Sequence, residues 1–231
     1  YCIGIHFFGQ ILLFFSFIYG KETDESPVNL TANTLSPLME RELRGCFDFF
    51  WNEWNDNPSS PTYGMTNGDY VGLKKYSPLA IENQGFYFTA IIIGVERGWI
   101  NREEGEKRIL ITLKTLRSLK RIKGFWYHFI DQDTGKRGWK DSNNIELSNA
   151  SSGTMLLGAL AASEYFGGEI KKITVQLYAE MDWKWFTNPV TKHPYLACYP
   201  EDLPDRLPAG ITNEGMFGGW AEYAEHIFLY I

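Results

Sequence analysis

The chain has 231 residues, a formal net charge of −6 and 16% aromatic residues. Its length allows one domain with a sizeable hydrophobic core, and its acidic balance argues against a nucleic-acid partner. Trp and Tyr are abundant, and these side chains stack on sugar faces while keeping a polar atom for hydrogen bonds; core packing is the alternative for any single one.

Residues 1–20 are predicted to form a signal peptide or a membrane anchor, because the run carries no charge before Lys21 and has an apolar centre. About twenty apolar residues would also span a bilayer, but the length favours an export signal. Both readings predict a periplasmic or extracellular protein, with membrane contact only through this segment if it is retained. We expect a polar linker over 21–35 and one domain, incomplete in this sequence, over 36–231.

The first predicted helix begins at Ser36, which has the side chain of an N-cap and precedes a proline. A loop rich in Asn, Pro, Ser and Gly follows over 55–76. The second predicted helix, over about 83–97, is apolar almost all round. This composition favours burial inside a larger assembly of helices.

Asn101 is the predicted N-cap of a third, amphipathic helix, with Glu104 three residues later as in a capping box. A second long loop spans 124–147. The fourth predicted helix, 148–166, is rich in Gly and Ala, which would let neighbouring helices approach closely. A fifth is expected over 169–185.

A third loop, 186–217, leads to a final predicted helix over 218–231, in which no stop signal appears. Strand-like patterns are confined to short pieces at 126–129 and 195–199, so we predict an all-α fold. Alternating buried and amphipathic helices with long loops are typical of an α/α toroid, whose loops at one end build a cleft. A compact helical bundle is the alternative.

Several segments occur in the order found in one known family. They are Gly85-Phe86, residues 94–100, Arg102 to Glu104, residues 124–129, Asp131 to Gly135, Glu146-Leu147-Ser148, Tyr165-Phe166, residues 182–185, and Trp220 with Tyr223, Glu225 and Tyr230. In these segments the chain resembles bacterial glucoamylase-like proteins, which include the β-1,2-glucan hydrolases of glycoside hydrolase family 144.

The resemblance implies an (α/α)6 barrel, of which this chain would hold about the first half. It also implies action on glucans outside the cytoplasm, with inversion of configuration and with neither a metal nor an organic cofactor. Glu225 matches the family's proton donor, and Glu146 a sugar-binding or second catalytic carboxylate. Ser151 departs from the pattern, because the family usually has an aspartate there.

The chemistry of the residues is consistent with the proton donor that the resemblance implies in the final helix. Glycoside hydrolysis needs a carboxylic acid that keeps its proton near neutral pH, for which burial beside aromatic rings is the usual device. Glu225 shares its helix with Trp220 and Tyr223, which are also candidate substrate contacts. The alternative is an exposed glutamate favoured by the helix dipole, and Glu222 is a local rival.

Further substrate-binding candidates lie in the loops. Trp126, Tyr127 and His128 are predicted to form an aromatic sugar-binding platform, although a lone histidine is more often structural. Asn67 and Asp69 are candidate partners of sugar hydroxyls. Asp131 and Asp133 are too few oxygen ligands for calcium and favour a turn, so we expect no metal site.

These observations predict an exported glycoside hydrolase acting on β-linked glucan, most simply β-1,2-glucan or its oligosaccharides, by general acid/base hydrolysis. The alternative is a non-catalytic glycan-binding protein that kept the toroid fold. We expect the full-length protein to be a monomer.

Overall fold

The structure is a computed structural model that describes residues 36–68, 77–138, 145–190, 192, 195 and 197–199. The chain divides into two compact units, 1–40 and 41–231, and the elements below lie in the second apart from the start of α2. The described helices are α2 (Pro37–Asn52), α3 (Ile81–Glu96), α4 (Arg102–Ser118), α5 (Asn149–Phe166) and α6 (Gly168–Ala179). The predicted leader, linker and final helix lie outside the described residues, and no described helix is long and apolar enough to cross a membrane.

The helices begin where local side chains can satisfy their first backbone N–H groups. The Ser36 hydroxyl accepts a hydrogen bond from Met39 N at 3.3 Å, and the Asn101 side chain accepts one from Glu104 N at 2.8 Å. Ser148 caps α5 in the same way, accepting from Ser151 N at 3.1 Å. The predicted starts of these three helices are therefore confirmed to within a residue.

The fifth helix ends earlier than predicted, at Ala179 rather than near 185. Asp182 turns the chain at this point: its backbone N–H donates to Lys123 O at 2.9 Å, and its carboxylate accepts from Trp185 N at 3.0 Å. An aspartate that bonds nearby backbone offers the chain an alternative to the helix. The tertiary contact with the turn at 123–124 thus ends the helix before the predicted position.

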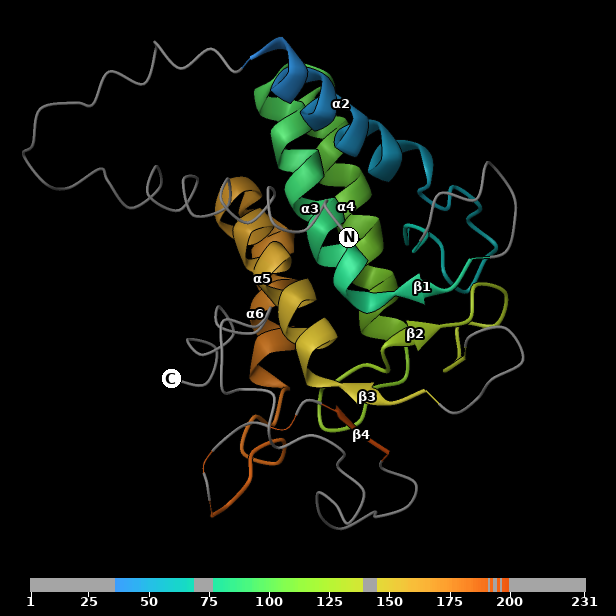
Figure 1. Cartoon of the computed structure of the whole chain (residues 1–231), viewed down its shortest axis with the longest axis vertical. Coiled ribbons are helices and arrows are strands. Elements are labelled where there is room, and N and C mark those ends of the chain that lie inside the picture. The colour runs from blue at the N-terminus through green and yellow to red at the C-terminus, as the bar shows by residue number, and fades with distance from the viewer. Residues whose placement is uncertain are drawn as a thin grey trace, which may run out of the picture. The chain divides into compact units, whose positions relative to one another are not determined.

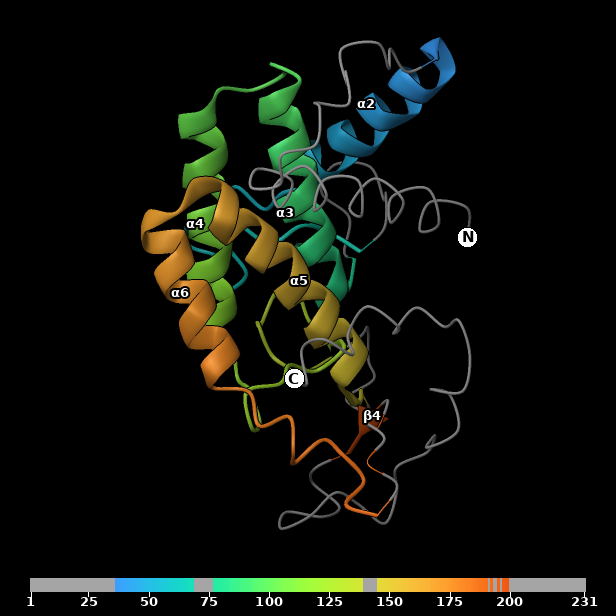
Figure 2. The ribbon, with the colours of Figure 1, turned by 90° about the vertical axis from the view of Figure 1, so that its left-hand side faces the viewer.

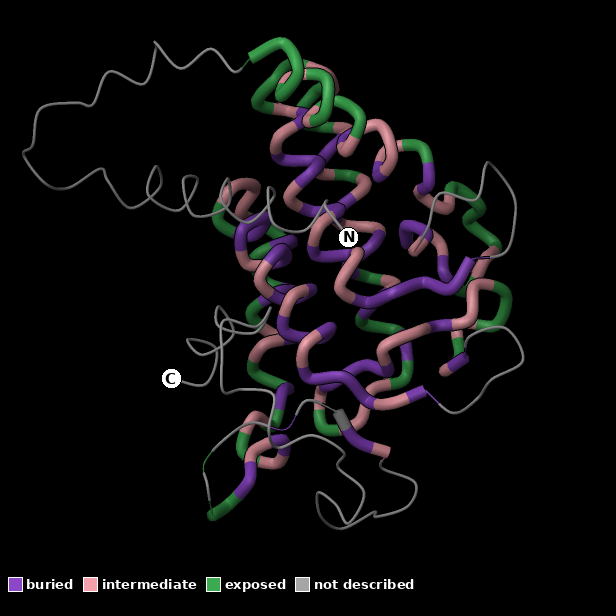
Figure 3. Tube along the Cα trace, in the orientation of Figure 1, coloured by how far each residue is buried: buried purple, intermediate pink, exposed green. Residues whose placement is uncertain are grey.

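α3 and α5 form an inner pair and α4 and α6 an outer pair, which confirms the burial predicted for the second helix, α3. α3 packs against α5 more extensively than against any other element, while α4 lies along both α3 and α6, and α5 along α6 (Figure 2). α3 and α5 bury residues on nearly every face, whereas α4 and α6 bury one stripe each and expose charged side chains (Figure 3). Two hairpins, α3–α4 and α5–α6, thus stand side by side as consecutive pairs of an α/α toroid.

The inner helices approach each other backbone to backbone at two glycines. A Cβ added to Gly158 would collide with the carbonyl oxygen and Cα of Gly85, and a Cβ added to Gly85 would collide with the backbone of Thr154 and Met155. Only glycine fits at such a crossing. The small residues noticed in the fourth predicted helix therefore set the distance between α3 and α5.

In the described part of the chain, four two-residue strands lie beyond the N-terminal ends of α3 and α5 (Figure 1). β1 (Leu79–Ala80) pairs antiparallel with β2 (Phe129–Ile130), and β3 (Leu147–Ser148) pairs antiparallel with β4 (Ala197–Cys198). A bridge between Tyr127 and Leu147 joins the two pairs. The extended pieces predicted at 126–129 and 195–199 overlap β2 and β4, and their partners β1 and β3 were not expected.

Replacing Gly158 with alanine should destabilise the protein by about 1–3 kcal/mol, because the new methyl group meets backbone that cannot move without separating the inner helices. Gly45→Ala is the matched control: this glycine lies within α2 with nothing within 4 Å of an added Cβ. It should stabilise by about 0.5–1 kcal/mol through helix propensity. Urea unfolding of both variants measures the difference, and equal effects would rule out the close crossing.

Candidate functional site

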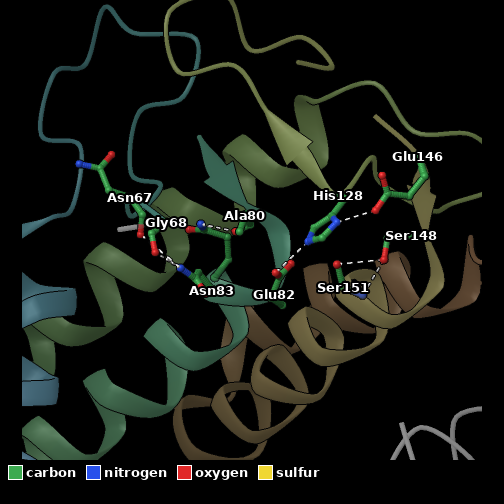
Figure 4. Close-up of polar contacts among 10 residues, drawn as sticks. Asn67, Gly68, Ala80, Glu82, Asn83, His128, Glu146, Ser148 and Ser151 are labelled. Atoms are coloured by element: carbon green, nitrogen blue, oxygen red, sulfur yellow. Dashed lines mark hydrogen bonds and ion pairs between the residues drawn. The ribbon is translucent and has the colours of Figure 1, made fainter. Parts of the chain in front are cut away.

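Three charged side chains meet at the end of the inner helices. Glu82 lies in the first turn of α3, His128 immediately precedes β2, and Glu146 immediately precedes β3 (Figure 4). Backbone hydrogen bonds fix their register: Ile81 N donates to His128 O at 3.1 Å, and His128 N donates to Glu146 O at 3.0 Å. His128 therefore sits on the middle segment with one carboxylate on each side. We call these three residues the charged triad.

Both ring nitrogens of His128 contact a carboxylate. Nδ1 lies 2.6 Å from Glu146 Oε1, and Nε2 lies 3.1 Å from Glu82 Oε1 (Figure 4). The His128 ring also stacks on Phe129, with ring centroids 3.9 Å apart. The three charged side chains are each about a quarter exposed, so the triad borders solvent.

The electrostatics favour a positively charged ring between two carboxylates. Burial alone would lower the pKa of His128, but the hydrogen bonds to Glu146 and Glu82 outweigh it and raise this pKa to about 9. Burial would likewise raise the pKa of Glu146, yet the hydrogen bond with His128 and the nearby charge of Arg137 lower it below its ordinary value. Glu146 is thus an ionised acceptor near neutral pH.

The aromatic platform predicted at 126–128 is corrected in part. Trp126 is 0% exposed and donates its ring N–H to Leu116 O at 3.0 Å, and Tyr127 is 1% exposed beneath the Arg137 guanidinium. A ring without exposed surface offers no face to a sugar. The structure therefore gives both rings a packing role, and among these three neighbours His128 alone borders solvent.

Asn67 and Glu53 form a second, more deeply buried polar contact. Asn67 Nδ2 donates to Glu53 Oε2 at 2.8 Å. Asn83 Nδ2 donates to Gly68 O at 3.0 Å (Figure 4). Asn67 is 8% exposed and its amide is committed to the carboxylate. The structure thus assigns Asn67 a role in holding the first long loop. Its predicted contact with sugar hydroxyls stays a prediction.

Ser151, which departs from the family pattern, lies at the start of α5 beside the triad. Its hydroxyl accepts a hydrogen bond from Ser148 Oγ at 2.9 Å, and its backbone N–H donates to the same oxygen. Ser151 is 4% exposed. A buried pair of hydroxyls thus occupies the position at which the resemblance implies an aspartate in the family.

The other predicted residues fall partly in the described and partly in the undescribed ranges of the chain. Glu225, Trp220, Tyr223 and Asp69 lie outside the described residues. Asp131 accepts hydrogen bonds from Thr134 N and Oγ1 at 2.8 and 2.7 Å, which confirms the predicted turn. Within the described ranges, no group of three or more His, Cys, Asp or Glu side chains could hold a metal ion.

Glu82 is the member of the triad that sequence reasoning missed. It reads as an ordinary first-turn glutamate, a position favoured by the helix dipole. The sequence did hold a signal, because Glu82 is an acidic residue at the start of a helix that is apolar along most of its length. Its partner, 46 residues away, comes into reach only through the β1–β2 pairing.

Comparison with known proteins agrees with this architecture. No family model matches the chain. It is 32% identical over 214 residues to an exo β-1,2-glucooligosaccharide sophorohydrolase (non-reducing end) of Parabacteroides distasonis, covering 87% of this chain and 28% of that protein.

Solved structures of similar fold belong to the same kind of protein. A candidate glucoamylase from Bacteroides uniformis is 28% identical with a TM-score of 0.62, over 73% of this chain and 41% of that one. An endo-β-1,2-glucanase from Chitinophaga pinensis, in complex with sophorotriose and glucose, is 25% identical with a TM-score of 0.58, over 72% and 42%. A β-1,2-glucanase from Parabacteroides distasonis is 26% identical with a TM-score of 0.59, over 71% and 24%.

Paired inner and outer helices with their loops at one end define part of an α/α toroid of the glucoamylase-like class. The chain belongs to the bacterial glucoamylase-like family that includes the β-1,2-glucan hydrolases of glycoside hydrolase family 144. It spans 28% of the curated relative and about two-fifths of the two toroid structures compared first, which fits the expected N-terminal half.

The triad predicts a stability loss at alkaline pH. Because the folded pKa of His128 is about 9 and its ordinary value is 6.5, its contribution is complete below about 6.5 and lost as pH rises through 9. For Glu146, whose pKa is lowered, the contribution is present above its ordinary 4.5 and lost on acidification through the lower folded value.

Urea unfolding of the intact protein from pH 6 to 10 measures this alkaline loss. A His128→Asn variant is the comparison, since it removes the titrating ring. We expect the urea concentration at the unfolding midpoint to fall as the pH rises from 7 to 10, and to fall more for the wild type than for the variant. Parallel curves would show that the ring does not carry the predicted charge.

Proposed function

We propose that the protein carrying this chain is an exported glycoside hydrolase that cleaves β-1,2-glucan or its oligosaccharides by general acid/base hydrolysis. The observation that carries the proposal is the 32% identity, over 87% of the chain, to a sophorohydrolase acting on β-1,2-linked glucooligosaccharides. Membership of a glycoside hydrolase family supports the reaction class. The linkage and the export are proposals.

The charged triad supports a division of labour between carboxylates. Because its pKa is lowered, Glu146 is a poor proton donor near neutral pH and a good acceptor of hydrogen bonds from sugar hydroxyls or water. A hydrolase also needs a carboxylic acid that keeps its proton. We assign that role to Glu225, with Trp220 and Tyr223 as neighbouring sugar contacts, and assign Glu146 to binding or to activation of water.

Glu225→Gln tests this assignment. Removing a general acid should reduce turnover of β-1,2-glucan by about 10²–10⁴-fold, since the leaving oxygen is then no longer protonated. The measurement is reducing-sugar release by the intact protein, with Glu222→Gln as a control on the same predicted helix and β-1,3-glucan as a control for the linkage. Unchanged activity in Glu225→Gln would remove the assignment.

The same assay addresses the alternative function. Ser151 stands where the family usually has an aspartate, and its buried hydroxyl pair is the observation that favours a glycan-binding protein without activity. Wild-type protein that binds β-1,2-glucan but releases no sugar would establish that alternative.

For export, N-terminal sequencing of the mature protein should find a start close to Gly20, and a retained apolar segment would contradict a cleaved leader.

A further inference from the structure

We propose that Glu82 is a positioning residue of this site: it holds the His128 ring in its charged form against Glu146 and thereby fixes the Glu146 carboxylate. Glu82 projects from the first turn of an inner helix, and Glu146 lies on a segment 64 positions later that reaches the same ring through the strand pairings (Figure 4). That this geometry serves a glucan substrate rests on the proposed function. The contacts among Glu82, His128 and Glu146 do not depend on that function.

The proton count of the ring follows from its two partners. A neutral imidazole has one N–H, so it can donate to one carboxylate and turns a lone pair toward the other. In the charged triad both ring nitrogens face a carboxylate oxygen, at 2.6 and 3.1 Å. Glu146 alone could be satisfied by a neutral ring with its proton on Nδ1. Glu82 is therefore the residue that requires the second proton.

The charges around the ring agree with this count. Glu82 from α3 and Glu146 from the segment before β3 face His128, and Arg137 from the turn after β2 acts on Glu146. With an imidazolium the charged triad carries one net negative charge, whereas a neutral ring would leave two carboxylates unbalanced in a partly buried site. Stacking on Phe129, with 17° between the two ring planes, favours the observed orientation of the ring between the carboxylates.

Glu82 acts through His128 rather than on a ligand. Its second carboxylate oxygen, Oε2, is buried and has no hydrogen-bond partner within the described part of the chain. An atom without accessible surface does not touch a sugar. Both N–H groups of His128 are likewise occupied by carboxylates. Both oxygens of Glu82 are thus either buried or bonded to the ring, and we assign ligand contact to Glu146.

The test compares Glu82→Gln with Glu103→Gln in the intact protein. Glu103 also lies in the first turn of a helix, α4, but it is exposed, so its replacement removes a helix-start carboxylate without touching the ring. Imidazole ¹⁵N spectra at pH 8, with His128 identified by its loss in His128→Asn, report the proton count of the ring. We expect two ring N–H groups in wild type and Glu103→Gln, and one, on Nδ1, in Glu82→Gln.

A kinetic pH profile gives the second readout. In Glu82→Gln, kcat/KM for a β-1,2-linked gluco-oligosaccharide should fall about tenfold at pH 8, as expected for loss of a charge-assisted contact. It should recover toward pH 6, where the ring takes up its second proton without Glu82. Glu82→Asp, which keeps the charge, should retain the doubly protonated ring.

The outcomes separate the two proposals. A doubly protonated His128 in Glu82→Gln at pH 8 overturns the positioning role, and so does a kinetic loss that is equal at pH 6 and pH 8. A wild-type protein without glucan turnover overturns the hydrolase proposal instead, while the ring spectra still decide whether Glu82 sets the charge of His128. Loss of the second ring proton in Glu82→Gln, with both ring protons kept in Glu103→Gln, supports the positioning role.

Discussion

The crossing of α3 and α5 at Gly85 and Gly158 is the contact on which the rest of the structure depends. Because backbone meets backbone there, no side chain separates the two inner helices, and their N-terminal ends open onto the same group of short strands. The outer helices α4 and α6 then cover the inner pair from one side. A site built from the first turn of one inner helix and the segment before the other follows from this crossing.

The electrostatics at the N-terminal ends of the inner helices favour the observed charges. The N-terminal end of a helix carries partial positive charge, which suits Glu82 in the first turn of α3. Strand pairing places His128 between Glu82 and Glu146, and their hydrogen bonds outweigh the effect of burial on the ring. Neither glutamate is left as an isolated, partly buried charge. The fold thus presents an ionised Glu146 at the border of solvent, which is what an acceptor of sugar hydroxyls requires.

Sequence reasoning succeeded where the cause was local. The hydroxyl of Ser36 and the amide of Asn101 predicted helix starts, and all-round apolarity predicted α3 as an inner helix. It failed where a distant partner decides. The burial of Trp126 depends on a carbonyl of α4, the early end of α6 on a contact with Lys123, and the role of Glu82 on the β1–β2 pairing. Composition alone cannot distinguish an aromatic ring in the core from one facing a sugar.

The most direct measurement is a crystal structure of the intact protein with a bound β-1,2-linked gluco-oligosaccharide. The account predicts a sugar hydroxyl within hydrogen-bond distance of the Glu146 carboxylate, with His128 still bonded to both glutamates. A sugar seated away from Glu146, or bound directly by a His128 ring released from Glu82, would contradict it.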